Sequence, residues 1–353
     1  DIGPSFPDAA RIWAGMWQAR TGEHVDGALT VDPSTLAYLL HVTGPTELPD
    51  GTAVTAHDVT NLTQSRQYML YPGFTVAQAT KRKQFLATIA QAVSRKLLDV
   101  ASPSELVAPL RRAVAEHRIL VWSDVASRER ALAAAGVAGV LRPGNAPFSG
   151  FVVDNASGGK MDFYLHRSTT YRTSTCRAGR TATASFTLSN ETPDYHLPAY
   201  VTYVSGGRPA GAAPGFNRTI VAYYATPGAR IRSVELDGKP LHLTPVREDS
   251  LTSVRTTVDL PADAHRTLRV VVREPATTGP VQILRQPLVH PLHVRTLGPS
   301  CAEASGHTAQ RTHGAGPGVV VVIVGAVVVL AAGGLVIRRR VVRSGRARGT
   351  DAA

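Results

Sequence analysis

The chain has 353 residues, a formal net charge of +12 and two cysteines. Its length predicts two ordinary domains, because single hydrophobic cores stop growing efficiently beyond about 250 residues. Residues 338–353 carry six arginines and one aspartate, or +5 of the charge, and the remaining +7 forms no basic patch with interleaved aromatic residues. This distribution argues against a nucleic-acid-binding protein. A mildly basic surface of this kind is consistent with a protein that faces anionic lipid or anionic wall polymer. It is equally consistent with a solvated surface that has no partner.

The first 150 residues alternate helical and extended patterns. Apolar residues at spacings of three and four predict a helix over 7–19, a second that Asp32 and Pro33 open, and further helices over 55–70, 76–98, 103–117 and 125–135. Residues 25–31 and 119–122 read as short buried strands. Strands separated by long helical stretches favour a mixed sheet covered by helices, so we expect an α/β domain over residues 1–150.

Beyond Gly150, apolar residues recur at every second position. Alternating apolar and polar residues predict short strands over 162–171, 181–189, 199–205, 219–225, 231–236, 251–260 and 267–273. The pair Asp237-Gly238 between two such runs is the most specific hairpin signal in the chain. Seven short strands at this spacing predict an all-β immunoglobulin-like sandwich over residues 151–300.

The C-terminal part has a different composition again. Residues 301–318 contain almost no apolar side chains and are expected to form a flexible stalk. Residues 319–337 carry no charge and no polar stripe, so a single transmembrane helix is predicted in preference to a buried one. Basic residues mark the cytoplasmic side of a span, here in the tail 338–353 that begins with Arg338, Arg339 and Arg340. We therefore expect a single-pass cell-membrane protein with its bulk outside the cytoplasm.

The N-terminus and the two cysteines are also consistent with a location outside the cytoplasm. The chain begins at Asp1 rather than at methionine, so we expect that an earlier segment has been removed. Cys176 and Cys301 bracket the second domain, and an oxidising exterior permits them to form a disulfide. The alternative is two free thiols. Two sulfurs without a histidine cluster do not indicate a metal site.

No strong catalytic motif is present: the sequence lacks a phosphate loop, a zinc helix of the HExxH type and a GxSxG elbow. We therefore expect neither a cofactor nor a catalytic residue. Arg66 and the pair Arg82 and Lys83 are candidate anion or pyrophosphate ligands, since the pair stands near the start of a predicted helix. The alternative is a solvated charged face of an amphipathic helix.

A polar stretch enters the second domain. Asp154, Asn155, Lys160 and Asp162 surround a glycine pair. Two acids could contact a hard cation, but Ca²⁺ requires six or more oxygen ligands and only three or four side-chain donors are visible. A structural turn is the favoured interpretation.

Several motifs carry a family resemblance. FPDAARIWAGMW, VDGALTVDPSTLAYLLHVTGP, LPDGTAVTAHDV, KRKQFLATIAQAV and VVDNASGGKMDFYL together resemble the actinobacterial domain-of-unknown-function family number 4012. That family has no established activity. The resemblance implies an architecture and an envelope location rather than a reaction.

The chain is also distantly similar to the LytR-CpsA-Psr family of envelope phosphotransferases. The similarity rests on VDGALTVDPSTLAYLLHVTGP, a following helix with an arginine, and a basic pair followed by glutamine and FL. It implies that Arg66 and Arg82 match arginines that bind a polyprenyl pyrophosphate. Tyr68 stands where a second arginine is expected, and no acidic residue precedes Arg82 in the matching place.

Together these observations predict a membrane-anchored envelope protein of unassigned activity. It would act in envelope or wall-polymer organisation by binding an anionic cell-wall polymer or a polyprenyl-linked glycan. The alternative is a phosphotransferase acting on a polyprenyl-pyrophosphate-linked glycopolymer.

Overall fold

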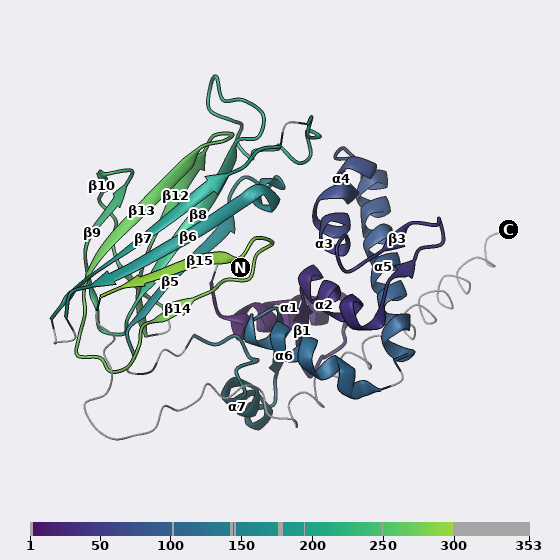
Figure 1. Cartoon of the computed structure of the whole chain (residues 1–353), viewed down its shortest axis with the longest axis horizontal. Helices are drawn as coiled ribbons and strands as arrows, with labels where there is room; N and C mark the ends of the chain where they lie inside the picture. Colours follow the sequence, from purple (N-terminus) through teal and green to yellow (C-terminus); the bar gives the residue numbers. More distant parts are fainter. Residues whose placement is uncertain are drawn as a thin grey trace.

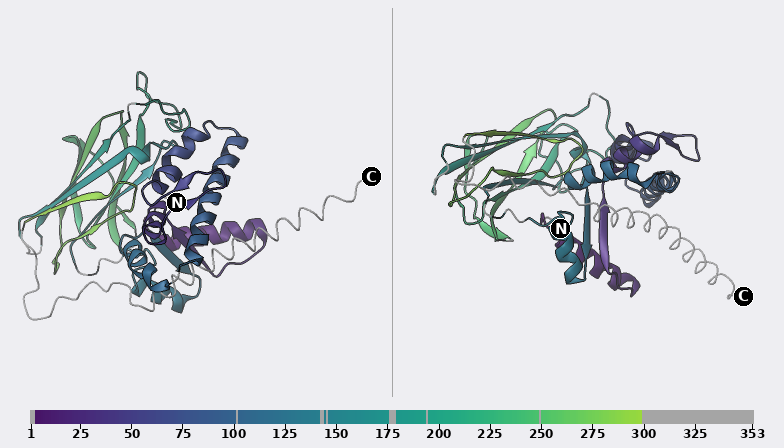
Figure 2. Two further views of the ribbon diagram at one scale, coloured as in Figure 1. Left: turned by 45° about the vertical axis from the view of Figure 1, so that its right-hand side comes forward. Right: turned by 60° about the horizontal axis from the view of Figure 1, so that its bottom comes forward.

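A computed structural model describes residues 3–100, 102–141, 144, 146–175, 179–193, 195–248 and 250–298. These residues form two lobes, one of helices and one of strands, and they lie side by side in both orientations of Figure 2. The helical lobe precedes residue 142 and the strand lobe follows residue 147.

The helical lobe contains the helices that the apolar spacing predicts. Its principal elements are α1 (Phe6–Thr21), β1 (Gly27–Val31), α2 (Pro33–Thr43), α5 (Val76–Leu98), α6 (Val107–Ala115), β4 (Ile119–Ser123) and α7 (Ala126–Ala134). Asp32 caps α2, because its side chain accepts a hydrogen bond from the Thr35 N–H at 2.9 Å. Thr75 caps α5 in the same way through Gln78.

The predicted helix over 55–70 is divided into three pieces. They are α3 (Val59–Asn61), a π-helical turn (Leu62–Arg66) and α4 (Gln67–Leu70). Two short strands, β2 (Thr46–Glu47) and β3 (Ala53–Val54), form a separate small hairpin. A 3-10 turn (Pro103–Leu106) precedes α6.

The sheet of this lobe differs from the prediction. β1 and β4 pair antiparallel as a two-stranded ribbon, with Gly27 opposite Ser123 and Val31 opposite Ile119. The helices between them pack mainly on one another, and α2, α5 and α6 share the apolar cluster that contains Leu40, Ile89 and Leu110. A helix-covered mixed sheet is therefore wrong for this lobe, because the helices supply most of their own core.

The strand lobe consists of two sheets that pack face to face (Figure 1). One sheet has the strand order β10-β9-β13-β7-β6-β15, and the other has the order β11-β12-β8-β5-β14. The strands are β5 (Phe148–Asn155), β6 (Leu165–Thr173), β7 (Thr181–Asn190), β8 (Asn217–Ala225), β9 (Arg230–Leu236), β10 (Lys239–Leu241), β11 (Val246–Glu248), β12 (Leu251–Leu260), β13 (His265–Arg273), β14 (Gln282–Leu284) and β15 (Leu292–Leu297).

Alternating side chains from both sheets build the core between them. Phe151 and Tyr223 from one sheet meet Phe186 from the other, and the rings of Phe151 and Phe186 stack at 4.6 Å. The predicted Asp237-Gly238 hairpin is confirmed: both residues have positive φ, and Lys239 pairs with Leu236 across the turn.

Two features of this lobe depart from the predicted immunoglobulin-like sandwich. The edge strands β14 and β15 pair parallel with β5 and β6, whereas immunoglobulin-like sheets are antiparallel. Residues 199–205, predicted as a strand, form a turn whose Val204 makes one isolated bridge to Gly158. Val201 in that turn is buried against the helical lobe, which accounts for the alternating pattern.

The predicted fold class is therefore corrected to a mixed α/β structure with two multi-stranded sheets. The predicted transmembrane helix is not supported, since none of the helices the structure describes is both long and apolar enough to cross a bilayer. The structure accordingly does not support a single-pass membrane location. The predicted stalk, span and tail, including Arg338, Arg339 and Arg340, lie outside the described residues.

The predicted disulfide is not supported either. No disulfide bridge occurs among the residues that the structure describes, and Cys176 and Cys301 both lie outside them.

Candidate functional site

A cavity of about 470 Å³ lies where the two lobes meet. Its helical side comes from the start of α1, from β4 and from the segment after α7, and its other side comes from β5 and the chain just beyond β14. Figure 1 shows these strands at the side of the sandwich that faces α1. The wall is mainly apolar and includes Phe6, Ala9, Trp13, Leu120, Ala138, Val140, Leu141, Val152 and Leu284.

The apolar wall follows from the outer face of the five-stranded sheet. Phe148 and Val152 point away from the sandwich core and belong to a separate cluster with Leu251 and Tyr224. Leu141 and Leu284 pack against this cluster. The cavity thus lies beside an apolar sheet face that the helical lobe covers only in part.

Gly139 brings the helical side of the wall close to α1. Its φ is +65°, and an added Cβ would approach Phe6 Cβ to 2.9 Å. The Phe6 N–H donates to the Gly139 carbonyl at 3.3 Å. Only glycine fits both the positive φ and the close packing at this point of the wall.

Five polar side chains lie among these apolar groups: Ser5, His117, Asp154, Arg285 and Gln286. Gln286 is fixed to the β5 backbone, since its Oε1 accepts from Val153 N and its Nε2 donates to Val153 O, each at 2.9 Å. Arg285 donates to the Leu292 carbonyl at 3.2 Å.

Asp154 and His117 have altered acidities. Burial raises the pKa of the Asp154 carboxyl, nearby Arg255 opposes this rise and Asp162 reinforces it. Burial among protein atoms lowers the pKa of His117, although the side chain keeps accessible surface on the cavity. Both changes favour the neutral form of the side chain, as an apolar environment requires.

A buried arginine joins the lobes next to the cavity. Arg118 follows the cavity residue His117 and donates to Asp32 Oδ2 at 2.5 Å and to Glu116 Oε2 at 2.6 Å. It also donates to the Leu288 carbonyl of the strand lobe at 3.4 Å. The sequence alone gave no indication of a role for Arg118, because its partners come from three separate segments.

A second junction contains one of the predicted anion ligands. Arg82 is buried, donates to the carbonyls of Tyr71 at 2.6 Å and Gly73 at 3.0 Å, and lies 4.0 Å from the ring centre of Tyr200. Tyr200 also stacks on Tyr68 at 5.6 Å. The guanidinium is thus held by protein groups from both lobes.

The other two predicted ligands are exposed. Arg66 ends the π-helical turn, and Lys83 lies within α5, seven residues after its start at Val76. Seven residues of helix span about 10 Å, so Lys83 lies beyond the unpaired N–H groups of the first turn. Among the described residues, no hydrogen bond or ion pair joins Arg66, Arg82 and Lys83 to one another.

The polar residues of the stretch 154–162 have two different roles, one in a turn and one in the cavity wall. Asn155 shapes the turn, since its Oδ1 accepts from Gly158 N at 2.6 Å and from Ser157 Oγ at 3.1 Å. Asp162 accepts from Asn217 at 3.2 Å. These bonds support the structural-turn interpretation for both residues, whereas Asp154 lines the cavity.

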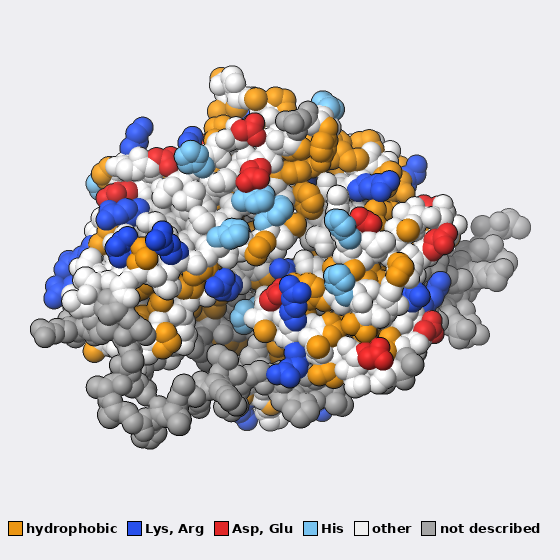
Figure 3. Space-filling view, viewed as in Figure 1, with side chains coloured by type: hydrophobic (Ala, Val, Ile, Leu, Met, Phe, Trp, Pro, Cys, Tyr) orange, Lys and Arg blue, Asp and Glu red, His pale blue; other side chains and the backbone are white. Residues whose placement is uncertain are grey.

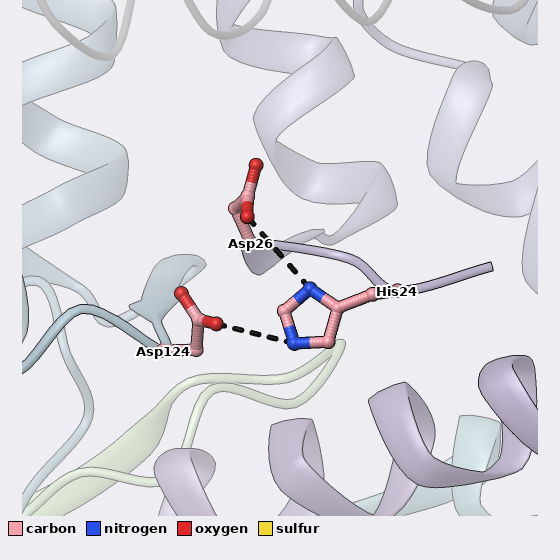
Figure 4. Close-up of side chains that lie close together, drawn as sticks. All are labelled: His24, Asp26 and Asp124. Carbon is pink, nitrogen blue, oxygen red and sulfur yellow. Dashed lines mark ion pairs between the residues drawn. The ribbon is translucent and has the colours of Figure 1, made fainter.

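One surface cluster has side chains that metals bind. His24 Nε2 lies 3.3 Å from Asp124 Oδ2, and His24 Nδ1 lies 3.8 Å from Asp26 Oδ1 (Figure 4). His24 and Asp26 are largely exposed, so water competes for all three groups. The cluster is an exposed ion-paired group at one end of the β1–β4 ribbon.

Hydrophobic side chains also gather at the surface, over α4 and the adjoining loop of the strand lobe (Figure 3). Phe74 lies there with Tyr203, at 5.3 Å between ring centres, and both are exposed. This patch continues the aromatic contacts around Arg82 to the outside of the molecule.

The N-terminal part of the chain is similar to a family without an assigned activity. Residues 1–68 match the family described as protein of unknown function DUF4012. This match supports the resemblance to that family, and it covers α1, β1, α2 and the turns up to the start of α4. The comparison with curated proteins gave no match.

Among the solved structures that match, one is similar over part of the chain. It is a Legionella pneumophila protein provisionally named as a nutrient binding protein, with 9% sequence identity and a TM-score of 0.23. The match covers 38% of this chain and 44% of that chain. Similarity at this level carries no argument about fold or ligand.

Proposed function

We propose that this protein binds a small, largely apolar ligand in the cavity between its lobes. The observation that supports the proposal is the cavity itself. Its volume of about 470 Å³ falls in the range of about 300–1,000 Å³ that is typical of small-molecule sites. An apolar wall with a few convergent polar groups at a lobe junction is the usual composition of such a site.

Binding can be measured with the neutral fluorescent probe N-phenyl-1-naphthylamine, whose emission rises in apolar surroundings. Ala9→Trp places a large side chain into the cavity from α1, and we expect it to weaken probe binding at least about tenfold. Ala19→Trp is the matched control, because Ala19 lies exposed on the same helix and does not line the cavity.

The proposal would be refuted if the wild-type protein failed to bind the probe. Equal affinity of the two tryptophan variants would place any binding elsewhere. Circular dichroism melting curves of both variants verify that the helical lobe is intact.

We propose as a second candidate that an anionic wall polymer or polyprenyl-linked glycan binds near Arg66 and Lys83. Both side chains are exposed, and neither has a hydrogen-bond or ion-pair partner within the described ranges. Binding of polyglycerol phosphate should then weaken in Arg66→Ala with Lys83→Ala and fall with added salt. Undiminished binding by the double variant would contradict this candidate.

A further inference from the structure

The cavity wall contains a carboxylate oxygen without a hydrogen-bond partner. Asp154 lies near the end of β5, on the same outer face of the sheet as Val152. Its Oδ2 is buried and has no partner in the structure. Buried polar atoms are nearly always paired in folded proteins, so an orphan in a cavity wall indicates a group that a ligand can satisfy.

Three protein donors close to Asp154 in the fold make hydrogen bonds elsewhere. Arg255, a cation on the same sheet whose charge lowers the pKa of Asp154, donates to Glu248 at 2.8 Å. The Asn155 amide donates to the Gly159 carbonyl and to Asp162. The Gln286 amide donates to Val153 O.

Within the described ranges, no side chain donates a hydrogen bond to Asp154 Oδ2. A ligand that brought a cationic donor would gain a charge-assisted hydrogen bond in an apolar environment, where such bonds are strong.

We infer that the ligand of this cavity is an amphiphile with a protonated amine and an apolar body, its amine paired with Asp154. The inference rests on the proposed function. The apolar body would contact the wall around Phe6, Leu120 and Leu284.

Arg285 provides the competing possibility, a ligand with a carboxylate end. It also lines the cavity, but its side chain is exposed and already donates to the Leu292 carbonyl. The charge at Arg285 is therefore better solvated than the charge at Asp154. Desolvation makes the unpaired carboxylate the group that gains more from a partner.

Three probes of equal chain length separate these possibilities: octylamine, octanol and octanoate, each competing with N-phenyl-1-naphthylamine. In the wild-type protein octylamine should bind at least about tenfold more tightly than octanol. In Asp154→Asn this preference should disappear, while the affinity for octanol stays within about twofold.

Asp8→Asn is the matched control, since it removes the same charge from an exposed position on α1 that does not line the cavity. It should keep the preference for octylamine. Loss of the preference in both variants would assign it to overall charge and refute the role of Asp154.

The two proposals fail in different ways. If octanol and octylamine compete equally, or octanoate competes best, the inference about the amine is wrong while the apolar site stands. If none of the probes binds, both proposals are wrong.

Discussion

The two lobes differ in how completely each buries its own apolar side chains. The sandwich encloses a core in which Tyr171, Phe186 and Tyr223 are almost fully buried. In the described chain, most exposed large hydrophobic side chains belong to the helical lobe, among them Trp13, Met16 and Trp17 on α1. The sandwich is thus a self-contained scaffold, and the helical lobe offers apolar surface to the cavity and to solvent.

The charged groups show the same contrast. Arg180 and Glu274 form an ion pair with fully buried side chains inside the sandwich, where Glu274 also accepts from Tyr171 and Thr226. Burial raises the pKa of Glu274 despite its cationic partner. Ion pairs of the helical lobe, such as Arg118 with Asp32, keep one partner partly exposed. Rigidity is therefore expected in the sandwich.

The largest effect should come from the buried ion pair. Arg180→Ala leaves Glu274 buried without its cation and should lower the free energy of unfolding by about 3–5 kcal/mol. Arg269→Ala is the control, because its ion pair with Glu235 lies on the sandwich surface, and it should cost less than about 1 kcal/mol. Urea denaturation measures both, and equal losses would contradict the contrast between the buried and exposed pairs.

The junction between the lobes should show the next largest effect. Arg82→Ala removes two hydrogen bonds to carbonyls and the contact with Tyr200, so it should destabilise the protein by about 2 kcal/mol. Lys83→Ala changes the exposed neighbour and should alter stability by about 0.5 kcal/mol or less. If the two variants melt at the same temperature, Arg82 does not join the lobes.

Two glycine substitutions, one in each lobe, test the contrast at single backbone positions. Gly238→Ala places a side chain at a φ of +75° in the β9–β10 turn and should cost about 1 kcal/mol. Gly15→Ala meets no atom within 4 Å in the interior of α1 and should stabilise the helix by about 0.5–1 kcal/mol. Thermal melting should therefore shift in opposite directions, and a shift in the same direction would show that one of the two conformations is wrong.

The smallest effect is a pH dependence at the cavity. Because burial raises the folded-state pKa of Asp154, this residue favours folding at pH values below its unfolded pKa, and that contribution is lost as pH rises through the folded pKa. Asp154→Asn should therefore be more stable than the wild type at pH 7, by under about 1 kcal/mol. The difference should shrink as the pH approaches about 4. A gain that persists unchanged at low pH would indicate a cause other than ionisation.

Local patterns in the sequence predicted the individual elements well. The helix over 76–98 is confirmed to the residue, because Thr75 caps it and its buried side chains recur at helical spacing. The Asp237-Gly238 turn is confirmed because its geometry depends on two adjacent residues. The strand over 251–260 also has the predicted bounds.

The sequence did not predict which distant segments pair as strands. Nothing in residues 27–31 shows that they pair antiparallel with residues 119–123 rather than within a larger sheet. The short edge strands β14 and β15 lack a long alternating pattern. The division into domains at residue 150 stays a prediction.

The candidate site was only partly visible for the same reason. The sequence indicated Asp154 only as a member of a polar turn, because the cavity that it lines is assembled from five separated segments. Arg66, Arg82 and Lys83 were chosen for their charge, and charge alone does not show which arginine is buried.

The parallel edge strand β14 has a consequence for the order in which the molecule is made. Residues 284–287 form one wall of the cavity, and they are held there by pairing with β5, which leaves the ribosome much earlier. During synthesis the helical lobe and β5 are present while this wall is still missing. The ligand pocket is therefore completed last, and a nascent chain that stalls before residue 282 exposes the apolar groups around Val152 to chaperones.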